Sequence, residues 1–573
     1  MASFQTALND RLASVIGRGG RGFDGWSLAA VAVAAILAAP ILVILGHVFV
    51  PAGDIWAHLA STVLPRYVFN TLWLFVGVGA GTLVIGVGCA WLVTMCRFPG
   101  AGVFEWALLL PFAVPAYVLA YAYTGMFEFA GPVQIWMREA FGWGPHDYWF
   151  PEIRSLGGAV AMMSLVLYPY VYLLSRAAFL EQSVCVLEVS RTLGSGPWRS
   201  FATVALPLAR PGIVAGLSLA LMETLNDFGT VDYFAVDTFT TGIYRTWLGL
   251  GEAAAAAQLA AILLLFVFSL VIIERWSRRR MRFHHTSNRY RRLLGYQLTG
   301  GRALAAFAAC ISPILLGFVL PGAALLAWSI ETAEEVIDAR FLGFAFNSFA
   351  LATLTSVIAV GVAVVLAYGT RLRRSKLIMA SVRVAGMGYA VPGAVIAVGI
   401  LLVSSEIDNT IDGWLRTTLG VSSGLIFTGT VAGIVFAYLV RFLAISLNTV
   451  EASLSKITPN MDAAARTLGH RPGSMLRRVH APLMWGSLLT AATLVFVDVM
   501  KELPATIIMR PFNFDTLAIR AYQLASDEQL AEASPAALGI VLVGIVPVIL
   551  LSLAIARSRP GSSTGPSTGP SHG

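Results

Sequence analysis

The sequence predicts an all-α integral membrane protein with about twelve transmembrane helices, arranged as two tandem six-helix repeats. Three observations carry this prediction: the composition is strongly apolar, long apolar segments recur along the chain, and a short polar segment occurs twice. Of the 573 residues, 57% are apolar and only 12% are charged, and the mean hydropathy is +0.75. So few charges cannot cover a soluble globule of this size.

Helices are the expected spanning elements because a helix satisfies its own backbone hydrogen bonds in lipid. A helix needs about 20 apolar residues to cross roughly 30 Å of hydrocarbon. The short alternating strands of a barrel do not stand out in the sequence. Twelve apolar segments are long enough, and they begin near Trp26, Val68, Val103, Gly157, Gly212, Ala256, Leu304, Phe346, Leu377, Gly424, Trp485 and Pro535.

The distribution of basic residues predicts the orientation of the chain. Nine Arg and no acid lie between Arg275 and Arg302, and the segment from Arg371 to Lys376 is also basic. Both lie on the same side as the N-terminus in a twelve-helix count. Because basic residues near short loops stay in the cytoplasm, this side is expected to be cytoplasmic, with both termini. Acidic residues gather in loops expected on the opposite side: Glu331, Glu334, Glu335, Asp338, Glu406, Asp408, Asp412, Asp527, Glu528 and Glu532.

The net charge of +8 is therefore explained by the basic residues on the cytoplasmic side of the membrane. Binding to nucleic acid is not expected, because no folded soluble domain is available for it. The lipid bilayer is the expected environment of nearly the whole chain.

A repeated polar segment shows that the chain is duplicated. One copy, EVSRTLGSGPWRSFATVALP, runs from Glu188 to Pro207, and the other, AAARTLGHRPGSMLRRVHAP, runs from Ala463 to Pro482. The offset is 275 residues at both ends (463 − 188 and 482 − 207). Since each half has an even number of helices, the two halves share one orientation, and their pseudo-two-fold axis should run along the membrane normal.

Other short words repeat at a similar offset. Phe69-Asn70-Thr71 returns as Phe346-Asn347-Ser348, and Ala113-Val114-Pro115 returns as Ala390-Val391-Pro392, both 277 residues later (346 − 69 and 390 − 113). We expect a cytoplasmic N-terminal segment, a first repeat, an Arg-rich linker, a second repeat and a tail that its composition makes disordered. These correspond to residues 1–25, 26–274, 275–303, 304–556 and 557–573.

The polar segments are expected to form a short surface helix, a turn at Gly194 or Gly469, and a second piece ended by Pro207 or Pro482, with Pro211 then starting the fifth span. The pattern E-x5-G with a distal L-P resembles the cytoplasmic EAA loop of permeases of binding-protein-dependent ABC importers. In that family the loop inserts a coupling helix into a groove of the ATPase subunit.

This resemblance covers both halves and implies which residues contact the ATPase. In the first copy they are Glu188, Arg191, Gly194, Leu206 and Pro207; in the second they are Asp462, Ala463, Arg466, Gly469 and Pro482. The second copy has Ala463 at the position of the glutamate, with Asp462 just before it as a substitute carboxylate. The two couplings are therefore expected to be unequal.

The chain itself is not expected to hydrolyse ATP, because the phosphate-binding pattern G-x4-G-K-[ST] does not occur in it. No catalytic residue and no bound cofactor are predicted. The resemblance implies a separate homodimeric ATPase that holds ATP and Mg²⁺ at the cytoplasmic face. It also implies a periplasmic substrate-binding protein and a location in the bacterial inner membrane.

Charged residues near the ends of the fifth and eleventh spans are candidates for the translocation path. Glu223 and Asp227 in the first half match Asp498 and Glu502 in the second, with Lys501 beside them. Burying such groups costs roughly 2.5 to 3.5 kcal/mol each, and a spacing of four places each pair on one helix face. They either line a polar path near its outer mouth, or Lys501 pairs with an acid and the acids anchor helix ends.

The sequence segments around these charged residues suggest a substrate. NDFGTVDYFAVDTFTTGIYR and KELPATIIMRPFNFDTLAIRAY resemble fused permeases of ferric-iron importers. Hard oxygen ligands suit a small trivalent cation, so transient metal contact is expected at Asp227 and Glu502. Related permeases import thiamine or an aminoalkylphosphonate, for which Lys501, Tyr117 and Tyr121 would serve. An alternative of another class is a secondary transporter whose carboxylates bind protons or sodium.

Overall fold

The computed structural model describes residues 25–51, 53–181, 197–279, 296–372 and 375–557. Almost every element in these ranges is a helix; two short strands, β1 (Cys96–Arg97) and β2 (Tyr296–Gln297), pair in parallel. Eleven helices of this part of the chain are long and apolar enough to cross a membrane. The number is twelve if Ala101–Ala113 and Ala116–Phe141, bent by 88° at their break, form one span. The all-α membrane fold is confirmed.

The helices of the first half follow one another in this order: α2 (Gly25–His47), α3 (Gly53–Thr62), α4 (Leu64–Met95), α5 (Ala101–Ala107), η1 (Leu110–Ala113), α6 (Ala116–Phe127), α7 (Pro132–Phe141), α8 (Leu156–Glu181), α10 (Pro197–Ser200), η2 (Phe201–Ala205), α11 (Leu206–Asn226), α12 (Gly229–Tyr233), α13 (Phe239–Tyr244), η3 (Arg245–Gly249) and α14 (Ala253–Arg279).

The helices of the second half repeat this pattern: α15 (Gly301–Ile314), η4 (Leu315–Val319), α16 (Leu320–Val336), α17 (Ala339–Leu372), α18 (Lys376–Ala385), η5 (Gly388–Ala390), α19 (Gly393–Leu419), α20 (Val431–Ser455), α21 (Pro459–Thr467), α22 (Pro472–Met475), η6 (Leu476–His480), α23 (Ala481–Met500), α24 (Pro504–Met509), α25 (Leu517–Ser526) and α26 (Leu530–Arg557).

Matched contacts confirm that the two halves are repeats. The Asn70 side-chain amide donates to the Asp237 carbonyl at 2.8 Å, and Asn347 donates to the Asp515 carbonyl at 3.1 Å. Each half also has a one-turn 3₁₀ helix, η1 or η5, followed by an extended proline that begins the next helix. The words that repeat in the sequence therefore hold equivalent places in the fold.

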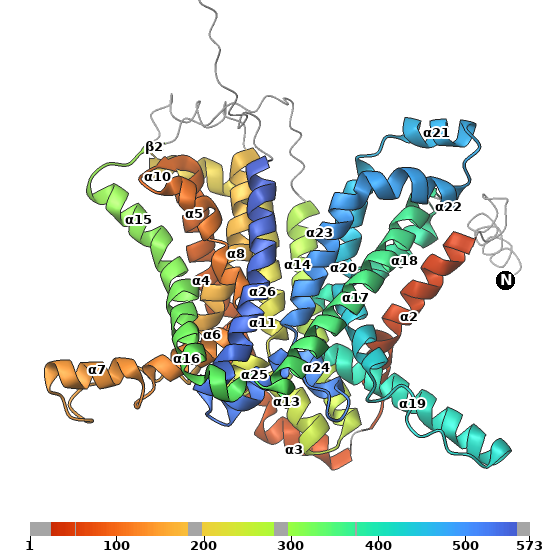
Figure 1. Ribbon diagram of the computed structural model, residues 1–573, viewed down its shortest axis with the longest axis horizontal. Coiled ribbons are helices and arrows are strands. Elements are labelled where there is room, and N and C mark those ends of the chain that lie inside the picture. The colour runs from red at the N-terminus through yellow and green to blue at the C-terminus, as the bar shows by residue number, and fades with distance from the viewer. Residues whose placement is uncertain (1–24, 52, 182–196, 280–295, 373–374, 558–573) are drawn as a thin grey trace, which may run out of the picture.

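The two halves are interlocked rather than packed as independent units. Helix α2 of the first half lies against α17, α18 and α19 of the second half, while α15 and α16 lie beside α4, α5 and α6 (Figure 1). Gly399 permits one of these approaches, since a Cβ there would stand 2.5 Å from the carbonyl oxygen of Pro40. The first span of each repeat therefore packs against the other repeat.

Two prolines expected to end a surface segment lie instead within continuous helices. Pro207 and Pro482 follow directly on π-helical turns, in which the Leu206 and Ala481 amides donate to the carbonyls of Phe201 and Leu476. Proline lacks an amide donor and clashes with the carbonyl four residues back, and a wider turn avoids both conflicts. The helices then run without a break, so Pro211 lies inside α11 rather than at the start of a span.

The ninth and tenth spans also differ from the prediction. Leu377 lies in the short α18, and the ninth span begins only at Gly393, after the break at Pro392. The tenth begins at Val431 rather than near Gly424. Helix α19 is therefore longer than expected, and Glu406, Asp408 and Asp412, which were expected in a loop, lie within it.

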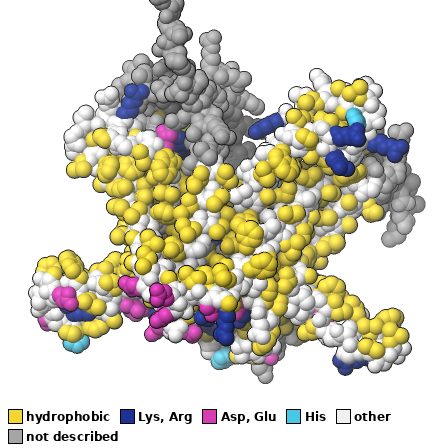
Figure 2. Space-filling view, in the orientation of Figure 1, with side chains coloured by type: hydrophobic (Ala, Val, Ile, Leu, Met, Phe, Trp, Pro, Cys, Tyr) yellow, Lys and Arg dark blue, Asp and Glu magenta, His cyan; other side chains and the backbone are white. Residues whose placement is uncertain are grey.

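Charged side chains gather at the two ends of the molecule. Figure 2 shows basic side chains at the end that carries α21 and α22, and a group of acidic side chains, with some basic ones among them, at the opposite end. Apolar side chains cover the surface between these ends. A band of this kind is what a bilayer-embedded protein presents to lipid.

Candidate functional site

Helices α11 and α23 both end at the centre of the molecule, where the two halves meet. After α11 the chain is extended at Asp227. After α23 it turns at Lys501 and reaches Pro504, which has no amide hydrogen to continue the hydrogen bonding of the helix. The short helices α12 and α24 follow. Asp227 and Glu502 thus lie just beyond the ends of these helices, while Glu223 and Asp498 lie in their last turns.

A cavity of about 100 Å³ lies at these breaks. All five residues proposed for the path line it: Glu223, Asp227, Asp498, Lys501 and Glu502. Residues that the sequence analysis did not single out also line it, notably Asn226, Tyr170 and Arg441. The charged lining consists of four carboxylates and two cationic side chains, an excess of two negative charges when all are ionised.

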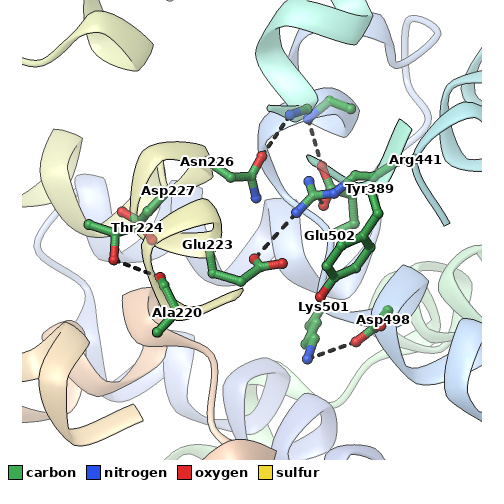
Figure 3. Close-up of polar contacts among 12 residues, drawn as sticks. Ala220, Glu223, Thr224, Asn226, Asp227, Tyr389, Arg441, Asp498, Lys501 and Glu502 are labelled. Carbon is green, nitrogen blue, oxygen red and sulfur yellow. Dashed lines mark hydrogen bonds and ion pairs between the residues drawn. The ribbon is translucent and has the colours of Figure 1, made fainter. Parts of the chain in front are cut away.

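Ion pairs cross this cavity (Figure 3). Arg441 of α20 pairs with Glu502 at 2.5 Å through Nη1 and with Glu223 at 3.5 Å through Nη2. Lys501 pairs with Asp498 at 2.8 Å. The arginine joins the halves, since Glu223 belongs to the first and Glu502 to the second.

Asp227 and Glu502 also hold the helices that follow them. Asp227 accepts hydrogen bonds from the Thr230 amide, the Thr230 hydroxyl and the Val231 amide at 3.0, 3.0 and 3.2 Å. Glu502 accepts from the Ala505 amide at 2.9 Å. Acidic side chains at such positions satisfy amides that the helix itself leaves free. The two interpretations of the acids, as the lining of a path and as anchors of helix ends, are therefore compatible.

Arg441 is the functional candidate that sequence reasoning missed. It interrupts the apolar run VAGIVFAYLVRFLAISL, and a charge at such a position marks a functional site by default. That signal was available in the sequence. What the sequence did not contain was its partner in the other half, because Glu223 lies 218 residues away (441 − 223).

Gly393 makes room for the arginine. A Cβ at this position would stand 2.8 Å from both Arg441 Nη1 and Glu502 Oε1. The Gly393 amide also donates to Asn226 Oδ1 at 2.6 Å in a buried bond between the halves. The first turn of α19 is therefore packed directly against the ion pair.

Substituting Gly393→Ala is expected to destabilise the protein by about 1 to 3 kcal/mol, because overpacking displaces the ion pair. Thermal unfolding of the purified protein measures this as a lower Tm. Gly413→Ala in the same helix is the matched control, since a Cβ at that position would meet no neighbouring atom within 4 Å. An equal Tm for the two variants would contradict the expectation.

Two tyrosines, Tyr117 and Tyr170, line the cavity, and each has another tyrosine beside it. Tyr117 lines the cavity, and its hydroxyl donates to the Lys501 carbonyl at 3.4 Å. The Tyr170 and Tyr389 hydroxyls, one from each half, lie 3.3 Å apart. Tyr121 is buried behind Tyr117, with ring centroids 5.7 Å apart. Of the two aromatics considered for an organic substrate, only Tyr117 lines the cavity.

Within the ranges that the structure describes, no three His, Cys, Asp or Glu side chains gather as a resident metal site would require. The carboxylates of Asp227 and Glu502, where transient metal contact is expected, are engaged by helix amides and by Arg441. A cation in this cavity would therefore have to compete with contacts that the protein already makes.

The second polar segment forms a helix–turn–helix at the end of the molecule opposite α7 (Figure 1). Helix α21 ends before Gly469, whose φ of +80° is a left-handed conformation that glycine adopts without strain. Ala463, Arg466 and Gly469 are exposed on this segment, as is Pro482 after it. In the first segment Leu206 is half-buried and Pro207 exposed, while Glu188, Arg191 and Gly194 lie outside the described residues.

Asp462 faces inward from this helix. Its carboxylate accepts from Arg371 Nε at 2.8 Å and pairs with His480 Nε2 at 2.8 Å. Arg371 also donates to the carbonyls of Leu454 and Ile457. Partial burial alone would raise the pKa of Asp462, but the hydrogen bonds from Arg371 and His480 hold it below its ordinary value of 3.8. This carboxylate ties α21 to the ends of α17 and α20.

Comparison with known proteins agrees with this architecture. Residues 82–283 match the family model described as the binding-protein-dependent transport system inner membrane component. The match includes the first polar segment and the first pair of path acids. The chain is a permease of a binding-protein-dependent ABC importer. It is thus a multi-pass inner-membrane protein, and in this family ATP hydrolysis belongs to a separate subunit.

Relatives whose names give different substrates are similar in sequence to this permease. The Fe(3+)-transport system permease protein FbpB 2 of Haemophilus influenzae is 28% identical over 488 residues, 84% of this chain and 88% of the relative. The molybdenum transport system permease protein ModB of Escherichia coli is 29% identical over 34% of this chain and 85% of its own. The sulfate transport system permease protein CysT of Escherichia coli is 32% identical over 26% of this chain and 52% of its own.

Proposed function

We propose that this permease moves ferric iron, delivered by a periplasmic binding protein, into the cytoplasm by alternating access. The observation that carries the proposal is the central cavity, whose four carboxylates come from both halves and outnumber its two cations. A cation is attracted to such a lining, whereas an oxyanion such as molybdate or sulfate is repelled by it. The similarity to FbpB 2 over most of both chains supports the same choice.

The size of the cavity supports a small inorganic cargo. Its volume of about 100 Å³ is room for about three water molecules. Pockets that bind organic ligands usually measure roughly 300 to 1,000 Å³, so thiamine or an aminoalkylphosphonate fits this conformation less well.

We further propose that the α21 end of the molecule is cytoplasmic and binds a homodimeric ATPase. Ala463, Arg466 and Gly469 are exposed there, where a partner can reach them. Their counterparts Glu188, Arg191 and Gly194, together with Leu206, Pro207 and Pro482, would complete the two contacts. The acidic end then faces the binding protein, both termini are cytoplasmic, and the repeats span residues 26–274 and 304–556.

The two ATPase contacts are expected to be unequal. In the second half Asp462 is held by Arg371 and His480. At the repeat offsets of 277 and 275, the first half has Thr94 and Ala205 in place of these two residues (371 − 277 and 480 − 275). The first half therefore has neither an arginine nor a histidine at the matched positions.

Transport in vesicles tests the substrate. The permease is reconstituted with its ATPase and binding protein, and ferric iron, thiamine and an aminoalkylphosphonate are offered in competition. ATP-dependent uptake of iron that the organic compounds do not reduce is the expected result. Preferred uptake of either compound would refute iron as the cargo. Uptake driven by an ion gradient without the ATPase would instead favour the secondary transporter.

A further inference from the structure

Arg441 holds the position that a cargo cation would be expected to take. Its side chain is only 6% exposed and its guanidinium lies between Glu502 and Glu223, one carboxylate from each half. A buried charge is tolerated only when it is paired. The two carboxylates and the arginine therefore form one unit, in which the Arg441 guanidinium is the cation that the carboxylates bind.

The surroundings are shaped for this cation. Gly393 leaves space that a methyl group would fill, next to both Arg441 and Glu502. The Arg441 Cζ lies 5.1 Å from the centroid of the Phe442 ring, a distance that favours a cation. Its Nε is buried with no hydrogen-bond partner among the described residues. The guanidinium is thus held through its two terminal nitrogens, and its hydrogen bonding is incomplete.

The arrangement breaks the symmetry of the repeats. At the offset of 275, the first half has Val166 at the position of Arg441 (441 − 275). Asp227, the counterpart of Glu502, has only helix-capping hydrogen bonds in place of an arginine. Both cationic side chains of the cavity, Arg441 and Lys501, therefore come from the second half.

We propose that Arg441 is a tethered cation that occupies the cation-binding position between Glu223 and Glu502 and is displaced from it by a multivalent cation during transport. While it is in place, it joins the two halves and neutralises the site. A multivalent cation competes with it because it concentrates more charge between the same two carboxylates. A monovalent ion has no such advantage, so the arginine selects against it. The inference rests on the cation path proposed above.

Terbium(III) tests this proposal directly, because it is a hard trivalent cation whose luminescence is excited by nearby tyrosines such as Tyr170 and Tyr389. The permease–ATPase complex is titrated with terbium in the absence of binding protein. Arg441→Met is expected to lower the terbium Kd at least tenfold, because it frees both carboxylates. Arg441→Lys is expected to give a smaller gain of about threefold, since lysine keeps the charge as a compact point.

A triple variant, Arg441→Met with Glu223→Gln and Glu502→Gln, is the matched control and should lose the gain. An unchanged Kd in Arg441→Met would overturn the proposal, as would a gain that persists in the triple variant. If the methionine variant does not assemble, the lysine variant decides, and equality with the wild type overturns the proposal.

This experiment is separate from the transport assay. A gain in terbium binding without ferric uptake would keep the role of Arg441 and remove iron as the cargo. Ferric uptake without any gain in terbium binding would keep the cargo and refute displacement of the arginine.

Discussion

Uptake by a complex that combines Asp227→Asn with Glu502→Gln is expected to fall at least about a hundredfold. The double variant removes two of the four carboxylates of the cavity and leaves Arg441 with Glu223 as its remaining ionised partner. The net charge of the cavity lining changes from −2 to zero, so a cation is no longer attracted to it. A loss of about 3 kcal/mol of cation stabilisation corresponds to about a hundredfold change in rate. Initial rates of ATP-dependent uptake in vesicles measure the effect.

The two substitutions are chosen so that the local fold survives. Asparagine and glutamine still accept hydrogen bonds through their carbonyl oxygens, so the amides of Thr230, Val231 and Ala505 keep their acceptors. Binding of the ATPase should therefore be unchanged. Glu139→Gln on the exposed surface of α7 is the control for loss of a negative charge. Wild-type uptake in the double variant would refute a role of these acids in translocation.

Much of the fold could be predicted because the signals are local. Apolar length identifies the spans, and short identical words identify the repeats. The interlocking of the halves could not be predicted, since no feature of the α2 segment shows that it packs on α18 and α19. Likewise, Pro207 and Pro482 predicted helix ends in the sequence. Only the backbone of the structure shows that a π-helical turn before each proline lets the helix continue.

The candidate site divides in the same way. The acids were found from their spacing and their matched places in two halves. Arg441 was visible as a charge in an apolar span, but its role depends on Glu223 in the other half and on the space left at Gly393. Asp462 was assigned to the ATPase contact by its place in a motif, and its side chain instead faces Arg371 and His480. A motif gives position along the chain, whereas the direction of a side chain depends on packing.

Substituting Asp462→Ala is expected to reduce the stimulation of ATPase activity by loaded binding protein at least tenfold. Helix α21 has nine residues, too few to be stable alone, and Asp462 joins it to Arg371 of α17 and to His480. Without this carboxylate, α21 no longer moves rigidly with α17 and α20, and Arg371 loses its ion-pair partner. ATP hydrolysis by the complex, measured with and without loaded binding protein, gives the stimulation.

The charge and the hydrogen bonds of Asp462 can be separated. Asp462→Asn keeps one acceptor for Arg371 and should give an intermediate stimulation, while Asp527→Asn at the opposite end is the control. Because the pKa of Asp462 is lowered in the folded protein, its contribution is present above the unfolded pKa near 3.8 and is lost only as pH falls through the lower folded value. Asp462 therefore stays ionised from pH 6 to pH 8, and its own titration adds no pH dependence to the deficit of the alanine variant in this range. Wild-type stimulation in this variant would show that the anchor does not transmit movement to the ATPase.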